Sequence, residues 1–379
     1  MEVKARQRAA LGTYFFIIGF SFSTWASRIP TLKTFFDLDE ATLGSLLLAM
    51  PVSSMLGLPI SGWLISRYNS RSPLLFSFFF FAIALTCIGF ASNLLALILA
   101  ISLFSFTMRI INISINTQAV TLQKVFNKKI IGSFHGLWSS GGLAGVGVST
   151  IMISYAVPIH YHLMGVAVVV LLIAGFMYRY LLTNDRAKEG NKLVFGKPDK
   201  FIGALGLMVF FASLCEGGMF DWSGVYFKEV VGVEVFTWGY LIFMIFMALS
   251  RFFSDAVIDY LGMRKLYLYS PCITACGILI MVFFPYFWPA IVGCCLVGIG
   301  VAAIIPMTFS LAGNSTKYSA GMAISIIATY GIIGMLLGPP LVGYLAQLID
   351  LRWAFLMFLF SSLMLIPISR QFFKRNDIR

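Results

Sequence analysis

The feature that most constrains this chain is a succession of long apolar runs, each about as long as a helix that crosses a lipid bilayer. A crossing helix needs about 20 mostly apolar residues, and these runs are too long and too uniformly apolar to be the alternating strands of a membrane barrel. The sequence therefore predicts an all-α integral membrane protein with twelve transmembrane helices, at about 9–28, 41–65, 73–92, 94–119, 131–156, 163–182, 201–226, 235–258, 266–287, 289–312, 319–346 and 352–370.

Composition supports this interpretation and excludes most soluble classes. Hydrophobic residues make up 59% of the chain and charged residues only 11%, whereas a soluble domain is about 25% charged. The net charge of +12 does not indicate a nucleic-acid partner, because basic residues in a membrane protein first report its topology. The six cysteines lie in apolar runs without metal-ligand spacing, so we expect small buried side chains rather than disulfides or metal ligands.

The basic residues predict an orientation. With the N-terminus inside, 21 of the 27 Lys and Arg residues fall on inner segments and four, including Arg28, on outer loops. Lys and Arg accumulate on the cytoplasmic side of membrane proteins, so both termini are predicted to be cytoplasmic. His160 and His162 are expected in a short, solvated outer loop, and the weakest helix boundary is Ser92-Asn93.

The chain carries an internal repeat. A shift of 193 positions places 62–71 on 255–264, and Gly141-x3-Gly145 on Gly334-x3-Gly338. Parallel repeats of this kind are typical of transporters, whose substrate site lies between the halves near the membrane midplane. We therefore expect an N-terminal six-helix bundle, a cytoplasmic linker and a C-terminal six-helix bundle, at 1–182, 183–200 and 201–379.

A sequence motif at the inner end of the second span, with a copy at the inner end of the eighth, is typical of one protein family. Residues 62–71 read GWLISRYNSR and 259–265 read DYLGMRK, which resembles the G-x-L-x-D-R-x-G-R-R pattern of the major facilitator superfamily. Ser66 replaces the acid in the first copy, whereas Asp259 keeps it in the second. The resemblance implies a transporter that works by alternating access, with a charge latch that gates the inner side. The gating candidates are Gly62, Arg67, Arg71, Asp255, Asp259, Gly262 and Arg264.

Two shorter motifs resemble one branch of that family. Residues 25–30 read WASRIP and 216–222 read EGGMFDW, which is similar to the bacterial YbjJ-like branch and implies a bacterial inner membrane. The Gly-rich motif of family exporters ends in Gly-Pro, but the fifth span lacks this proline. This absence weakens any inference of export from the resemblance.

Charged residues inside a span are expensive, which makes the few present candidates for function. Arg109 lies in the fourth span, and Asn112 and Asn116 follow at i+3 and i+7, on the same helical face. We interpret this polar stripe as substrate-binding. The alternative is a structural Arg that donates to carbonyls of a facing helix. Arg251 could likewise form a purely structural i,i+4 pair with Asp255.

Glu216 is the candidate for proton coupling. It lies in the seventh span beside Gly217-Gly218, which would permit either local unwinding or close helix approach. A membrane-embedded acid is typical of proton relays in transporters, so Asp221 is a second candidate for proton coupling, and we expect Asp221 or Arg109 near Glu216. The alternatives are a permanent ion pair for Glu216, and a solvated gate or cap for Asp221.

Aromatic and imidazole groups complete the set of candidates. Trp25 and Trp222 hold equivalent positions near the outer ends of the first and seventh spans. They could anchor in the interfacial belt or form walls of the substrate path. His135 and Trp138 share one face of the fifth span, and are interpreted as substrate-binding, although a lone His is often structural.

These observations predict a proton-coupled secondary transporter of a small polar organic solute, such as a sugar or sugar-like metabolite. Amides hydrogen-bond hydroxyls, and indole faces stack on sugar rings. Since no phosphate-binding loop, metal cluster or nucleophile–base motif is present, we expect neither a cofactor nor an enzyme, and we expect a monomer in the bilayer. Two alternatives remain: an exporter of amphipathic drugs or metabolites, and a non-transporting sensor with the same fold.

Overall fold

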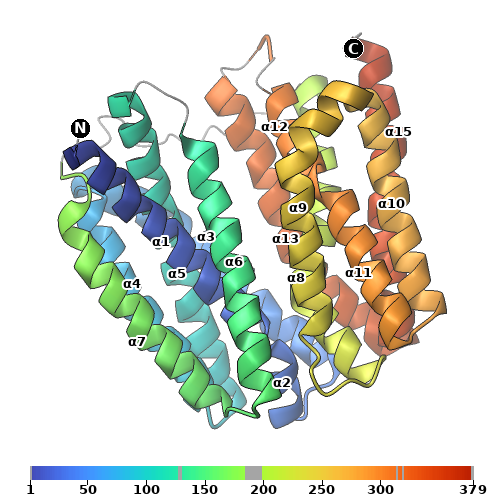
Figure 1. The fold of residues 1–379 in the computed structure, drawn as a ribbon, viewed down its shortest axis with the longest axis horizontal. Helices are drawn as coiled ribbons and strands as arrows, with labels where there is room; N and C mark the ends of the chain where they lie inside the picture. The colour runs from blue at the N-terminus through green and yellow to red at the C-terminus, as the bar shows by residue number, and fades with distance from the viewer. Residues whose placement is uncertain (1, 127–129, 184–198, 313–314, 318–319, 377–379) are drawn as a thin grey trace. The chain divides into compact units, whose positions relative to one another are not determined.

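The regular structure is helical throughout the part of the chain that the computed structural model describes, residues 2–126, 130–183, 199–312, 315–317 and 320–376 (Figure 1). Most of the predicted linker 183–200 lies outside these residues. The earlier helices are α1 (Glu2–Ala26), α2 (Ile29–Phe35), α3 (Glu40–Arg67), α4 (Arg71–Phe90), α5 (Leu94–Phe126), α6 (Ile131–Ser154), α7 (Ile159–Met177) and η1 (Tyr178–Tyr180). The later helices are α8 (Lys200–Glu229), α9 (Trp238–Leu261), α10 (Met263–Phe283), α11 (Phe287–Ala302), α12 (Ile304–Ala312), α13 (Ala320–Ile349), α14 (Leu351–Ala354) and α15 (Leu356–Asn376).

The predicted fold class is confirmed. Within the described residues, 11 helices are long and apolar enough to cross a membrane, and α9 adds the shorter apolar stretch Trp238–Arg251. The break at Ser92-Asn93 is also confirmed, because α4 ends at Phe90 and α5 begins at Leu94. Asn93 fixes the start of α5, since its side-chain oxygen accepts a hydrogen bond from Ala96 N at 2.9 Å.

The chain forms two compact units, residues 1–36 with 49–194 and residues 37–48 with 195–379. The first turns of α3 therefore group with the second unit. There Gly44 lies against Pro340 and Gly343 of α13, and Ser45 Oγ is 2.8 Å from Tyr344 Oη. This short segment differs from the predicted division at 182, and the domain boundaries themselves stay a prediction.

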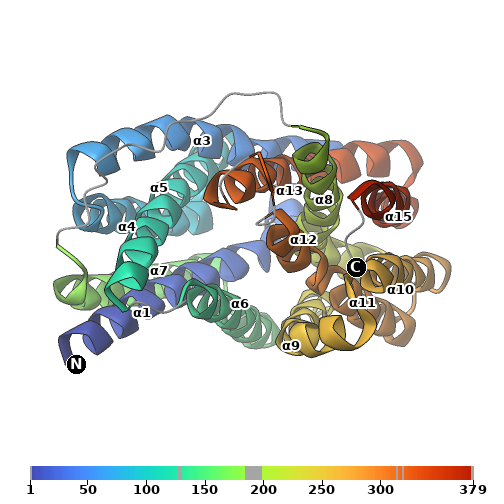
Figure 2. The same ribbon diagram turned by 90° about the horizontal axis from the view of Figure 1, so that it is seen from above.

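The internal repeat is visible in the way each unit packs its closest helix pair. In the first unit α1 lies on α6, and a Cβ added at Gly141 would collide with the carbonyl oxygen of Phe16. In the second unit α8 lies on α13, and a Cβ added at Gly334 would collide with the carbonyl oxygen of Phe210 (Figure 2). Small residues allow helix backbones to approach where lipid supplies no hydrophobic drive for association. The repeated glycines thus mark equivalent contacts.

Proline breaks the predicted tenth span into two helices. The span at 289–312 is α11 followed by α12, with a turn at Ala303. Pro306 has no backbone N–H, so it cannot donate to the carbonyl of Ala302 four residues earlier. The break therefore leaves the carbonyl of Ala302 available to a side chain.

The expectation of a solvated histidine loop is wrong. Pro158, with φ −54° and ψ 142°, precedes α7, which begins at Ile159 and so includes both His160 and His162. His162 is buried, and its Nδ1 accepts a hydrogen bond from Arg28 Nε at 3.1 Å. Arg28 Nη2 also donates to the carbonyl of Val157 at 2.9 Å. Arg28, expected in an outer loop, is only 4% exposed and ties the turn between α1 and α2 to the start of α7.

Replacing Arg28 should therefore destabilise the protein. Arg28→Met leaves His162 Nδ1 and the carbonyl of Val157 without their donor, and hydrogen bonds from a charged group contribute about 1.5–3 kcal/mol each. We expect a clear fall in the thermal unfolding midpoint of the purified protein in detergent. The exposed Arg67 supplies the control, since Arg67→Met should change the midpoint little. Equal effects of the two substitutions would show that Arg28 does not hold this corner.

Candidate functional site

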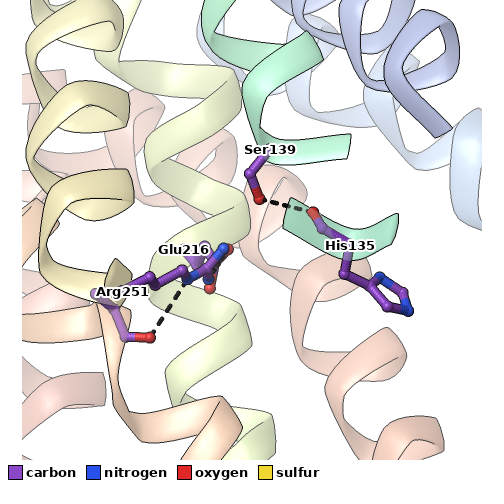
Figure 3. Close-up of polar contacts among 5 residues, drawn as sticks. His135, Ser139, Glu216 and Arg251 are labelled. Atoms are coloured by element: carbon purple, nitrogen blue, oxygen red, sulfur yellow. Dashed lines mark hydrogen bonds and ion pairs between the residues drawn. The ribbon is translucent and has the colours of Figure 1, made fainter. Parts of the chain in front are cut away.

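Inside the second unit an ion pair joins α8 to α9. Arg251 Nη2 lies 2.9 Å from Glu216 Oε1, and the side chains are 26% and 8% exposed (Figure 3). The second carboxylate oxygen, Oε2, is buried and has no hydrogen-bond partner among the described residues. The site is thus a paired carboxylate with one unused acceptor oxygen.

The broken tenth span helps to position Arg251. Arg251 Nε donates to the carbonyl of Ala302 at 3.4 Å, the same carbonyl that Pro306 leaves without a helical donor. The guanidinium therefore contacts α8 through Glu216 and the end of α11 through Ala302. A planar group with several N–H donors suits this double contact better than a lysine ammonium would.

The glycines beside Glu216 allow neighbouring helices to approach α8 closely, and α8 does not unwind there. Helix α8 continues from Lys200 to Glu229 without interruption. A Cβ at Gly217 would lie 2.8 Å from Met335 Cγ of α13, and one at Gly218 would collide with the ring of Phe358 in α15. The two glycines let α13 and α15 pack tightly around the turn of α8 that carries Glu216.

The described partner of Glu216 is Arg251, whereas the sequence suggested Asp221 or Arg109. Asp221 lies five residues further along α8 and is half-buried. Trp222 beside it is completely buried, and its Nε1 donates to the carbonyl of Pro339 at 3.0 Å. Trp25 is also completely buried, but its Nε1 has no hydrogen-bond partner in the described part of the chain. Buried indoles do not reach a lipid interface, so the belt interpretation does not fit either Trp.

In the first unit, Arg109 of α5 contacts α3. Its Nε donates to Ser54 Oγ at 2.8 Å, and the side chain is partly buried. Gly57 makes room for it, since a Cβ at that position would lie 3.1 Å from the Cβ of Arg109. The described hydrogen bond is thus to a side chain of a facing helix, which uses one of the five N–H donors of the guanidinium.

The rest of the predicted substrate set is divided between helices α5 and α6. Asn112 and Asn116 are half-buried on α5, and Asn116 Nδ2 donates to the carbonyl of Asn112 at 2.7 Å. His135 is exposed on α6, where Ser139 Oγ donates to its carbonyl at 3.2 Å (Figure 3). Trp138 is half-buried, with its ring 6.2 Å from that of Phe22. The substrate-binding role of these residues stays a prediction.

The predicted gating residues are mainly at the surface. Arg67, Asp259 and Arg264 are exposed. Arg71 instead lies over the ring of Tyr178, 3.9 Å from its centroid, an arrangement that favours a cation–π contact. Gly262 ends α9 with φ +78°, a conformation that favours glycine. The surroundings of Gly62 and Asp255 lie outside the described residues, and with them the proposed Arg251–Asp255 pair.

Three residues that form these polar contacts were not among the binding or coupling candidates predicted from the sequence. Arg251 was noted inside a span but not as the partner of Glu216, although the two charges lie on consecutive long helices. Ser54 carried no signal, since serines are frequent in the apolar runs. Gln118 is buried, and its Nε2 donates to Ser70 Oγ at 2.8 Å and to the carbonyl of Leu182. Its place near the inner end of a span could have marked it as a clamp between segments.

The chemistry available in these groups is binding and proton exchange. Among the described residues, no group of three or more His, Cys, Asp or Glu could hold a metal ion. A buried carboxylate with a free oxygen can accept a proton, and the guanidinium and amide groups can donate hydrogen bonds to a polar solute.

Comparison with known proteins identifies similar sequences over nearly the whole chain. The model of the Major Facilitator Superfamily matches residues 11–331 and 238–377. An uncharacterized MFS-type transporter of Yersinia pestis is 31% identical over 352 residues, which cover 92% of this chain and 91% of that protein. Membrane protein MosC of Rhizobium meliloti is 28% identical over 371 residues, 97% of this chain and 90% of that protein.

Solved structures show the same fold at low sequence identity. A point mutant of the nucleoside transporter NupG has a TM-score of 0.76 and 14% identity, with 96% of this chain and 100% of that chain covered. A bacterial homolog of the human lysosomal transporter Spinster has a TM-score of 0.73 and 13% identity, with 99% and 97% covered. At these identities the likeness shows the fold alone.

Because Glu216 and Arg251 form an ion pair, the effects of substituting the two residues on stability should not be additive. Removing one partner of a buried ion pair leaves a charge without compensation, whereas removing both does not. We expect Glu216→Gln and Arg251→Gln each to lower the thermal midpoint, and the double variant to lose less than their sum. The coupling should be on the order of 0.5–3 kcal/mol, as for residues in direct contact. Additive losses in a double-mutant cycle would mean that the two side chains do not interact.

Proposed function

Because the chain belongs to the Major Facilitator Superfamily and is a secondary transporter rather than an enzyme, we propose that it moves a small polar organic solute by proton-coupled alternating access. The solute class is a sugar or sugar-like metabolite. Two helical bundles exposing a site alternately to the two sides of the membrane would perform the transport.

The observation that carries the proton-coupling proposal is the half-satisfied carboxylate of Glu216. Arg251 bonds one oxygen, and the other oxygen is buried without a described partner. A proton on Glu216 would cancel its charge and weaken the pair, and Arg251 would then be available to another acceptor. This coupling between a proton and a guanidinium is what a symporter needs to make solute binding depend on protonation.

The proposed solute class rests on the polar side chains of α5 and α6. Arg109, Asn112 and Asn116 offer N–H donors and amide oxygens to hydroxyl groups. His135 and Trp138 add an imidazole and an indole, whose face suits a sugar ring. Asp221, five residues beyond Glu216 on α8, is proposed as a second proton-coupling residue, and Trp25 and Trp222 are proposed as substrate-binding residues.

We also propose where the protein works. The basic bias of the segments predicts cytoplasmic N- and C-termini, and the curated relatives from Yersinia pestis and Rhizobium meliloti support a bacterial inner membrane. The resemblance of 25–30 and 216–222 supports the YbjJ-like branch, and we propose a monomer as the functional unit.

A flux assay tests the coupling role. Purified protein is first screened by thermal shift against sugars, organic acids and amphipathic cations, and the solute that stabilises it is used in proteoliposomes. Glu216→Gln should abolish accumulation driven by a proton gradient while solute counterflow partly persists, because the substituted amide cannot carry a proton. The exposed Glu234 supplies the control, and Glu234→Gln should accumulate normally.

The same assay separates the alternatives. Unchanged accumulation in Glu216→Gln would remove this residue from proton coupling. A proton gradient that drives amphipathic compounds in exchange for protons would favour an exporter. Saturable binding without any flux in the wild-type protein would favour a sensor.

A second pair of variants tests the polar stripe on α5. Asn116→Ala should raise the solute dissociation constant about fivefold, since a hydrogen bond contributes about 1 kcal/mol. Thr117 is the matched control, because it is half-buried on the next position and its Oγ1 donates to the carbonyl of Ile113 at 2.8 Å. Thr117→Ala should bind normally. Equal affinities in all three proteins would exclude Asn116 from the site.

A further inference from the structure

A groove on the second unit is not used by the proposed transport site. It has a volume of about 380 Å³ and lies between α9, α10 and α11, which are neighbours in Figures 1 and 2. Its walls are mostly carbon, and they include Val257 and Leu261 of α9, Leu266 and Ile273 of α10, and Ile299 of α11. Val257, Tyr269 and Cys272 are exposed, so the groove opens to the surroundings of the helices.

The length of the groove matches one leaflet of a bilayer. Its lining residues on α9 are Ser250, Val257 and Leu261, and the 11 positions from the first to the last span about 16 Å at 1.5 Å per residue. The hydrocarbon core of a bilayer is about 30 Å thick, so the groove covers about half of it. It begins beside the turn that joins α9 to α10, where Leu261 and Leu266 lie. A chain that enters at this turn would end near the middle of the membrane.

A basic residue, Lys265, lies at the mouth of the groove, on the face of α10 that lines it. Lys265 is exposed and precedes Tyr269, Cys272 and Ile273 by four, seven and eight positions, which places them on one helical face. Asp259 of α9 is two positions from the lining residue Val257, and two positions rotate a side chain by about 200°. Asp259 therefore lies on the opposite face of α9 from Val257, and among the described residues the charge on the groove side is that of Lys265.

We propose that this groove binds an anionic phospholipid of the leaflet on the side of the α9–α10 turn. One acyl chain lies along α9, α10 and α11, and the phosphate lies at Lys265. A membrane-spanning helix of a second copy would need a groove of full bilayer depth, whereas this one is a single leaflet deep. The positive charge at its mouth favours a headgroup with net negative charge over a zwitterionic one. The site does not depend on which solute the protein moves.

Alkylation of the native cysteines can report whether a lipid occupies the groove. Cys272 lines the groove, whereas Cys276 lies one turn further along α10 and is also exposed. The full-length wild-type protein in detergent micelles is titrated with phosphatidylglycerol or with phosphatidylcholine of identical acyl chains, and alkylation by maleimide is followed at each cysteine by peptide mass spectrometry. Phosphatidylglycerol should slow alkylation of Cys272 while leaving Cys276 and the exposed Cys87 unchanged. Phosphatidylcholine should need a higher concentration for the same protection.

Two variants test the two parts of the site. Lys265→Gln should raise the phosphatidylglycerol concentration for half-protection about fivefold, which corresponds to about 1 kcal/mol for one basic residue near a headgroup. Lys374→Gln, the same change at an exposed lysine of α15, should leave it unchanged. Val257→Trp, at an exposed lining position, should fill the groove and prevent lipid-dependent protection.

Four results would overturn the proposal. Equal protection of Cys272 and Cys276 would show a general effect of lipid on the micelle. Equal potency of the two lipids, or no change in Lys265→Gln, would remove the anionic headgroup from the site. Lipid protection that persists in Val257→Trp would place the acyl chain elsewhere.

Discussion

Hydrocarbon offers no hydrogen-bond partner, so every polar group inside this helical body depends on a partner within the chain. Hydroxyls such as those of Ser21 and Thr150 donate to the carbonyl four residues earlier in their own helix, and other polar side chains bond a different segment of the chain. Arg251 bonds Glu216, Arg109 bonds Ser54, and Gln118 bonds Ser70 and Leu182. These contacts connect helices that are otherwise held by apolar packing. Among the groups left without a described partner is Glu216 Oε2, on which the proposed proton coupling rests.

The two units share one packing scheme but differ in their chemistry. Glycines at equivalent positions bring α1 onto α6 and α8 onto α13. The equivalent tryptophans diverge, because Trp222 donates to Pro339 whereas Trp25 Nε1 is buried without a described partner. The first unit carries a guanidinium bonded to a hydroxyl, and the second a guanidinium bonded to a carboxylate. A repeat that keeps its backbone contacts and changes its polar groups can give each half a different role.

Much of the fold follows from local properties of the sequence. Apolar length predicts the number of spans, and Asn93 and the glycine spacing mark a boundary and the repeat. Three local details of the structure differ from the prediction. Pro306 divides a predicted span, Pro158 starts α7 earlier than expected, and His162 is buried where solvent was expected. A run of apolar residues reports a membrane span, but it does not report how proline alters hydrogen bonding inside that run.

The sequence predicts which residues are candidates for the site, but it does not predict which of them contact each other. The sequence by itself determined which charges are rare enough to matter, because a charge in an apolar run is visible without any structure. Only the tertiary structure decided that Glu216 pairs with Arg251, 35 positions away, and that Arg28 bonds His162, 134 positions away. Such pairs depend on which faces of two helices meet, and that is fixed by close packing at glycines and by breaks at prolines rather than by the spacing of the charges. The groove beside Lys265 has the same origin, since it exists only where three helices leave space between them.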